Sequence, residues 1–203
     1  MAEDREEERA DSATRRRRRG PRTVTAPLLE KAALHYLERF ASSSAHLKRV
    51  LMRRVARSAR ADGSDAAAGE RLVDDIVQRY LRAGLLDDAA YAASQAASLR
   101  RRGASRHAIR GKLALKGIDA AQVEHALASV EGTEGSEIAA AAAFARRRRL
   151  GPYRAGATRD SHRQKDLATL ARAGFSLDLA RRVLAAADPD ALDALVRGAA
   201  DEN

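Results

Sequence analysis

The stretch from Gly84 to Ile118 decides the fold, and it reads GLLDDAAYAASQAASLRRRGASRHAIRGKLALKGI. Gly84 and Gly117 each follow an apolar run of helical period, and glycine readily takes the left-handed conformation that ends a helix. Two short helices are therefore predicted between them, separated at Gly103. From Arg100 to Lys116 the chain carries seven basic residues and no acidic one. This is a place where an anion or an acidic partner can bind.

The composition predicts a helical protein with a thin core. The chain has 203 residues, of which 45% are hydrophobic and 3% aromatic, so a core of Leu, Val, Ile and Ala between helices is expected, without a large central sheet. The absence of cysteine excludes disulfides and fits a reducing cytoplasm, which is the expected location. No apolar run approaches the ~20 residues of a membrane-spanning helix, and the N-terminus lacks the apolar segment of a signal peptide. No membrane partner is expected.

The net charge of +10 is concentrated in two places. Residues 1–27 contribute only +2, because their arginines are nearly balanced by acidic residues. Residues 100–116 and 146–165 contribute +7 each, so the rest of the chain is acidic. Two separate basic patches on an otherwise acidic body favour nucleic acid or an acidic protein surface as the partner.

Helical periodicity predicts three groups of three helices, within residues 28–83, 84–131 and 136–187. Residues 1–27 have few large apolar side chains and are expected to be a disordered charged tail. Residues 188–203 are expected to be a C-terminal tail in which Leu192, Leu195 and Val196 allow one short helical turn. Residues 62–69 and 151–161 are predicted loops, and Phe40 is expected on the buried face of the first helix.

A repeat relates the second group to the third. When the sequence is aligned with itself so that Gly117 matches Gly174, apolar residues align with apolar residues and helix caps with helix caps. Leu113, for example, aligns with Leu170, and Ile118 with Phe175. Tandem helical units of this size bury their faces against their neighbours. The predicted fold is therefore all-α, with three tandem three-helix repeats that form an elongated, curved body.

The basic patches yield the candidate contact residues. Arg106 and Arg110 are one helical turn apart on one edge of the Ile109 and Leu113 stripe, with basic residues on the other edge as well. Such side chains often serve solubility alone, but the lack of a compensating acid and the second patch favour binding. The candidates are Arg101, Arg102, Arg106, Arg110, Lys112 and Lys116, extended by Arg146, Arg147, Arg148, Arg149, Arg154 and Lys165. Tyr153 is the only aromatic expected on the surface, so contacts to nucleic acid should involve phosphates rather than stacked bases.

No catalytic or metal-binding constellation is recognisable in the sequence. The five histidines have no carboxylate partners at ligand spacing, and no phosphate-binding glycine loop of the G-x-x-x-x-G-K-[ST] type occurs. We therefore expect a protein that is not an enzyme, with no catalytic residues, no metal and no cofactor.

Two alternatives remain open from the residues alone. Residues 105–127 are two short helices joined by a glycine turn, as in a helix-turn-helix DNA-binding protein. Against this, the second helix carries Glu124 and no cation, whereas a helix in the major groove normally presents Arg, Lys, Asn or Gln to the bases. The other alternative is a helical scaffold whose charge is incidental.

The chain resembles the RecX family of regulators of the RecA recombinase. The resemblance covers about residues 28–187 and rests on a motif in the middle group, formed by Gly84, Leu86, Asp88, Tyr91, Gly103, Ile109, Leu113, Gly117 and Ile118. At Gly111 and Lys112 the chain departs from the polar and acidic residues usual in the family. The resemblance implies a protein that is not an enzyme and that binds the RecA filament on single-stranded DNA and restrains ATP hydrolysis and strand exchange. We expect this protein to be a monomer. The basic candidates would then contact RecA and DNA phosphates.

Overall fold

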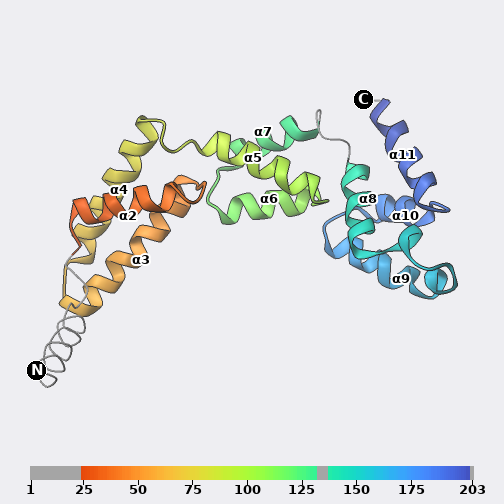
Figure 1. Cartoon of the computed structure of the whole chain (residues 1–203), viewed down its shortest axis with the longest axis horizontal. Helices are drawn as coiled ribbons and strands as arrows, with labels where there is room; N and C mark the ends of the chain where they lie inside the picture. The colour runs from red at the N-terminus through yellow and green to blue at the C-terminus, as the bar shows by residue number, and fades with distance from the viewer. Residues whose placement is uncertain (1–23, 132–136, 202–203) are drawn as a thin grey trace, which may run out of the picture. The chain divides into compact units, whose positions relative to one another are not determined.

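The computed structural model describes residues 24–131 and 137–201, and every regular element within those ranges is a helix. The predicted all-α fold is therefore confirmed. The chain divides into two compact units, Met1–Leu86 and Asp87–Asn203, and Figure 1 shows the helices of each. Most of the predicted charged tail at residues 1–27, and most of the predicted linker before the third group, lie outside the described residues.

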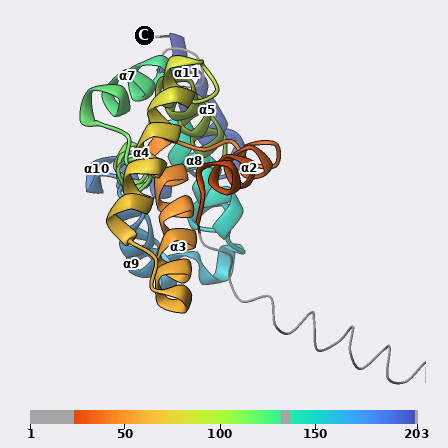
Figure 2. The ribbon, with the colours of Figure 1, turned by 90° about the vertical axis from the view of Figure 1, so that its left-hand side faces the viewer.

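The first unit contains α2 (Ala26–Leu37), α3 (Ser44–Asp62) and α4 (Ala66–Arg82). Figures 1 and 2 both show α3 and α4 lying side by side, and these two helices form the most extensive contact of the unit. The Ser43 side chain begins α3 by accepting a hydrogen bond from the backbone N–H of His46 at 3.2 Å. The core is built from aliphatic side chains and one tyrosine, namely Leu29, Ala33, Leu47, Leu51, Val55, Val73, Ile76, Val77, Tyr80 and Leu86.

The predicted loop at residues 62–69 is too long, because α4 already begins at Ala66. The Asp65 carboxylate caps the helix by accepting from the backbone N–H of Ala67 at 2.8 Å, and Gly69 lies in the first turns of the helix rather than breaking it. A Cβ on Gly69 would lie 2.5 Å from Cγ1 of Val55. The glycine therefore allows α3 and α4 to approach closely.

Phe40 was expected to be buried, and that prediction is wrong. Helix α2 ends at Leu37, so Phe40 follows the helix instead of continuing its apolar face. Its side chain is 55% exposed, and its ring lies 5.2 Å from the ring of Tyr36.

The second unit begins with α5 (Asp88–Arg101), α6 (Arg106–Leu115) and α7 (Ala120–Glu131). Side-chain oxygens cap all three helices: Asp87 accepts from the N–H of Ala90 at 2.9 Å, Ser105 from that of Ala108 at 3.1 Å, and Asp119 from that of Gln122 at 2.9 Å. The large apolar residues of the family motif form the core of this group: Tyr91, Ile109, Leu113 and Ile118 are all buried.

The same backbone corner ends several helices. At Gly84, Gly103, Gly117 and Gly174 the φ angle is between +71° and +90°, and the next residue donates its N–H to the carbonyl five positions earlier, as Ile118 does to Leu113 at 3.2 Å and Phe175 to Leu170 at 3.2 Å. This is the Schellman arrangement, with an apolar residue after the glycine. Gly117 and Gly174, which the sequence repeat superposes, share this geometry. Arg149 adopts it too, with φ +54°.

The rest of the second unit contains α8 (Glu137–Arg148), the short 3-10 helix η1 (Gly151–Tyr153), α9 (Gly156–Arg172), α10 (Leu177–Ala185) and α11 (Pro189–Asp201). The predicted loop at residues 151–161 is wrong in extent, because η1 and the first turns of α9 occupy most of it. The core of these helices includes Ile138, Leu150, Leu170, Phe175, Val183 and Leu192.

The C-terminal helix is also longer than the single turn predicted. Asp188 caps α11 by accepting from the N–H of Ala191 at 2.8 Å, and Pro189 occupies the first helical position, where a missing N–H costs nothing. The Asp-Pro pair thus starts a helix rather than ending one. Helix α11 contacts α8, and the Leu192 side chain is fully buried.

Candidate protein and nucleic-acid interface

The first basic patch contains one arginine that does not face solvent. Arg100 is buried near the end of α5, where its Nη1 donates to the carbonyl of Ala104 at 3.3 Å and to Oε2 of Glu137. Oε1 of Glu137 accepts from the backbone N–H of Arg106 at 2.9 Å. One carboxylate of α8 therefore holds both the end of α5 and the start of α6. Arg100 belongs to the structure of the unit and is not a contact residue.

A second carboxylate binds two of the candidate contact residues. Glu124 of α7 accepts from Arg110 Nε at 2.8 Å and Arg110 Nη2 at 3.2 Å, and from Arg106 Nη2 at 3.0 Å. Hydrogen bonds from Arg110 and then from Arg106 lower the pKa of Glu124 to about 2. The prediction that the basic patch has no compensating acid is therefore wrong. All three side chains are more than 40% exposed, so the pair stays on the surface.

The other candidates on α5 and α6 face solvent to different degrees. Arg101, Arg102, Arg110 and Lys112 are exposed, whereas Arg106 and Lys116 are half-buried. Within the described ranges, Arg102 and Lys112 have no ion-pair partner. Among the described residues of the first patch, Arg102, just after α5, and Lys112 are thus open to an outside anion.

Gly103 brings the end of α5 close to α8. Its position is so close to α8 that a Cβ there would lie 2.6 Å from the backbone nitrogen of Phe144 and 2.8 Å from the carbonyl oxygen of Ala140. The end of α5 therefore lies against the middle of α8, a few residues before Arg146, where the second patch begins. Only a residue without a side chain permits this approach.

We use the name junction surface for the arginines of these two neighbouring segments: Arg101, Arg102, Arg146, Arg147, Arg148 and Arg149. The four arginines of the second patch are all exposed. The guanidinium carbons of Arg147 and Arg148 lie 5.8 and 5.9 Å from the centre of the Phe144 ring, at the distance of a cation–π contact. Phe144 in turn packs edge-on against buried Phe175. The arginines thus lie over an anchored aromatic ring.

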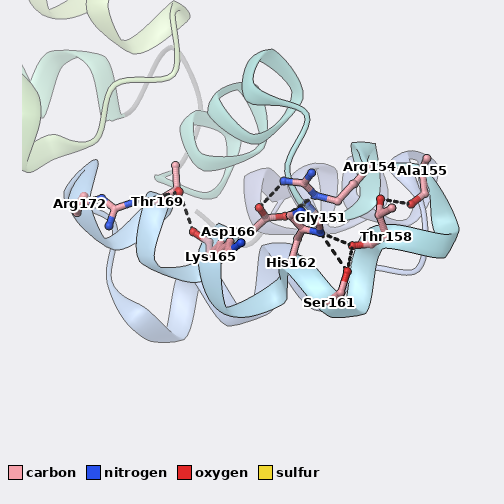
Figure 3. A network of polar contacts seen from close by, with 10 residues as sticks. All are labelled: Gly151, Arg154, Ala155, Thr158, Ser161, His162, Lys165, Asp166, Thr169 and Arg172. Atoms are coloured by element: carbon pink, nitrogen blue, oxygen red, sulfur yellow. Dashed lines mark hydrogen bonds and ion pairs between the residues drawn. The ribbon is translucent and has the colours of Figure 1, made fainter.

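Arg154 has a different environment from its neighbours in the second patch. Figure 3 shows it reaching Asp166 of α9, with Nη2 to Oδ1 at 2.7 Å and Nε to Oδ2 at 3.2 Å. The Asp166 side chain is buried and also accepts from the backbone N–H of Gly151 at 2.9 Å. Burial alone would raise the pKa of Asp166, but the bonds from Arg154 and Gly151 outweigh it and lower that pKa. This pair fastens η1 to α9, and Arg154 is better explained as structural.

Lys165 and Tyr153, further along the second patch, also differ in their exposure. Lys165 is exposed on α9, and its backbone carbonyl accepts from Thr169 Oγ1 at 2.7 Å. Tyr153 is half-buried against the core of the third group, and its pKa is raised by burial and then by the charge of Asp193. The expectation of an exposed Tyr153 is therefore wrong.

Ser105 has a contact that the sequence did not reveal. Besides capping α6, its Oγ donates to the carbonyl of Ala173 at the end of α9 at 2.6 Å. A Cβ on Gly174 would lie 2.7 Å from that same Oγ. A capping signal alone predicts the local bond, but a partner 68 residues away leaves no local pattern.

Other kinds of site were also sought in the structure. Within residues 24–131 and 137–201, no three His, Asp or Glu side chains come together in a way that could hold a metal ion. In the same part of the chain, no helix has the length and apolar character needed to cross a membrane.

Comparison with known proteins identifies the relatives of the chain. The family model for the second three-helix domain of RecX matches residues 87–127, which contain α5, α6 and most of α7. The chain is 46% identical over 165 residues to the "Regulatory protein RecX" of Myxococcus xanthus, covering 81% of this chain and 88% of that protein. It is 36% identical over 110 residues to the protein of the same name from Agrobacterium fabrum, covering 54% and 57%.

Two solved structures share the fold. A crystal structure of regulatory protein RecX aligns with a TM-score of 0.57 at 22% identity, over 78% of this chain and 70% of that one. The crystal structure of RecX from Lactobacillus salivarius aligns with a TM-score of 0.56 at 18% identity, over 83% and 97%. Because the sequence identity to the Myxococcus protein extends over most of both chains, this chain belongs to the RecX family of regulatory proteins.

Proposed function

We propose that this chain regulates the RecA recombinase by binding the RecA filament on single-stranded DNA, and that it lowers the rates of ATP hydrolysis and strand exchange. Its membership of the RecX family supports this role. In this proposal the chain acts in the cytoplasm, as a monomer and without a cofactor or catalytic step of its own.

The junction surface is the observation that carries the proposal. Arg102 and the run Arg146 to Arg149 are exposed, and within the described ranges none of them has an ion-pair partner. A cluster of arginines without acids can bind acidic protein surfaces and phosphates, and such binding weakens with salt. Lys112 and Lys165 extend the set of contact residues, whereas Arg106 and Arg110 share their charge with Glu124.

The direct test adds the full chain to cognate RecA on single-stranded DNA and follows ATP hydrolysis. We expect the rate to fall at or below one copy of the chain per RecA protomer. An unchanged rate at equal ratios would contradict the proposal.

A matched pair of variants tests the surface. Arg102→Glu combined with Arg147→Glu should raise the concentration of the chain needed for half-maximal inhibition at least tenfold, because two exposed cations become anions. Arg182→Glu, an exposed arginine of α10 without an ion pair in the described structure, should inhibit like the natural chain. Helical circular dichroism should be the same in all three proteins. Equal loss in both variants would show that net charge matters and the junction surface does not.

The geometry argues against sequence-specific reading of duplex DNA by a helix-turn-helix. Helix α7 would be the recognition helix, yet its exposed Glu124 is held by Arg106 and Arg110. Helix α7 itself has no Lys or Arg to present to the bases or phosphates. A strong preference for one duplex sequence at ~0.15 M salt would restore this alternative.

A further inference from the structure

A third basic surface lies on the first unit, on helix α3. His46, Arg53, Arg57 and Arg60 fall within about 40° of one line along the helix, because a helix turns 3.6 residues per turn. Leu47, Leu51 and Val55 are buried on the other side of the helix, while Arg53, Arg57 and Arg60 are exposed. We name these three arginines the α3 row.

Three acidic residues of the first unit are bound away from this row. On α4, Glu70 and Asp74 contact Lys48 at 3.4 and 2.6 Å, and Lys48 projects from the side of α3 opposite to His46. Glu30 of α2 pairs with Arg79. Within the described part of the unit, no ion pair involves the α3 row. With respect to the residues that the structure describes, the row therefore presents three exposed cations without an ion-pair partner.

An aromatic pair lies at the start of this row. Tyr36 Oη lies 3.1 Å from Nε2 of His46, which is the first residue on the line of the row. The Phe40 ring packs on Tyr36 with the centres 5.2 Å apart and is 55% exposed. A single exposed apolar residue has no special meaning. Here, however, the exposed ring lies at the start of a line along α3 on which the three arginines follow, from Arg53 about 10 Å beyond His46 to Arg60 about 21 Å beyond it.

We propose that this surface binds single-stranded nucleic acid, with phosphates on the α3 row and a base stacked on Phe40. Arginines one turn apart, about 6 Å along the helix, can each meet a different phosphate of one strand. Proteins that bind single strands without sequence preference combine a basic track with aromatic rings on which bases stack. The site needs no RecA, lies apart from the junction surface in the sequence, and adds a base contact where phosphate contacts alone were expected.

The test measures binding of the full chain to a labelled oligo-dT strand by fluorescence anisotropy across a range of salt, without RecA. Arg53→Gln with Arg57→Gln should reduce the slope of log K against log salt by about 1.4, since each phosphate contact on a single strand contributes about 0.7. Arg82→Gln with Arg71→Gln, which removes two exposed arginines of α4, is the matched control and should leave most of the slope unchanged.

The stacking of a base on Phe40 is tested by comparing strands with and without bases. Phe40→Ala should weaken binding to oligo-dT about five- to tenfold without changing the salt slope, and should have no effect on an abasic strand of the same length. Phe40→Leu keeps an apolar side chain over Tyr36 and should show the same selective loss. Leu34→Ala, at an exposed apolar position of α2, should bind normally.

Several outcomes would overturn the inference. One is an unchanged salt slope in the double arginine variant with helical circular dichroism intact. A second is equal weakening of oligo-dT and abasic strands by Phe40→Ala, which would mean that no base stacks there. A third is a double arginine variant that binds the oligonucleotide normally but no longer inhibits RecA, which would assign the α3 row to a protein partner. Because RecA is absent from the binding assay, a negative result there would reject this nucleic-acid site alone. The proposed regulation of RecA would still be decided by the ATP hydrolysis assay.

Discussion

Arg147 and Arg154 belong to the same basic segment, yet their surroundings give them different roles. Arg147 is exposed beside the Phe144 ring, whereas Arg154 is bound by the buried carboxylate of Asp166. A count of charges along the sequence treats them alike. The neighbouring helix decides which arginine is available to a partner. Exposed arginines and arginines bound inside the protein therefore cannot be told apart from the sequence without the fold.

At Gly103 the residue type is required by contact and by conformation together. Gly103→Ala should lower the free energy of unfolding by about 2–4 kcal/mol, because a left-handed alanine costs about 1–2 kcal/mol and its Cβ would overlap the backbone of α8. Gly84→Ala is the matched control: φ is +71° there, but nothing lies within 4 Å of its Cβ position, so only the first cost applies. Urea unfolding followed by circular dichroism measures both. Equal losses would mean that the α5–α8 contact is loose.

The Asp166 carboxylate predicts a pH dependence of stability. Its pKa in the folded chain is lowered below the ordinary 3.8, so its stabilisation is complete above the unfolded pKa and is lost as the pH falls through the folded one. Asp166→Asn should lower the free energy of unfolding by about 2–3 kcal/mol at pH 7, and this difference should shrink below about pH 4. Asp178→Asn, in an exposed pair with Arg181, should change it by less than about 0.5 kcal/mol. A pH-independent difference for Asp166→Asn would refute this explanation.

At the scale of helices, the sequence predicted starts and ends well wherever local chemistry determines them. Gly84 and Gly117 were identified as helix stops and Gly103 as the break between α5 and α6, because the bonds that end a helix join residues a few positions apart. Two glycine or proline signals were misread: Gly69 packs inside α4, and Pro189 begins α11. In both cases a residue that usually breaks a helix is placed where its special geometry is useful.

Helices α6 and α7 share charge through Glu124. Glu124→Gln removes the carboxylate that Arg106 and Arg110 both contact, and leaves both guanidinium groups in place. We expect this variant to bind oligo-dT a few times more tightly at low salt, with a steeper salt slope, because phosphates then replace the lost partner. Gln122→Glu, a charge change of the opposite sign on the same helix, serves as the comparison. Unchanged binding of Glu124→Gln would mean that these arginines do not reach the strand.

At the scale of the molecule, contacts between distant segments determine the second unit, and they left no signal in the sequence. Arg100 and Glu137 are 37 residues apart, and Ser105 reaches Ala173 across 68. Hydrophobic period and capping report only neighbours along the chain. The all-α fold could therefore be predicted, but the packing of Gly103 against α8 could not, and neither could the exposure of Phe40.

The Glu137 carboxylate should control how the second unit unfolds. Glu137→Ala leaves the buried Arg100 guanidinium without this carboxylate and removes an acceptor at the start of α6, so we expect a loss of about 2–4 kcal/mol. Glu137→Gln keeps an amide oxygen in place and should lose less. The same urea titration should show a broader transition for Glu137→Ala as the α5–α7 and α8–α11 groups separate. A small loss with an unchanged transition would show that the groups are held by apolar packing alone.

Arg149, the last arginine of the junction surface, has a left-handed backbone conformation. Of the residues that the structure describes, it is the only one other than glycine with a positive φ, and left-handed backbone costs a non-glycine residue about 1–2 kcal/mol. The corners at Gly84, Gly103, Gly117 and Gly174 avoid that cost. An arginine at this corner gives up stability to keep a fourth consecutive positive charge. Arg149→Gly would therefore be a more stable protein with a weaker surface, and a search for thermostable variants of this chain would select against its binding.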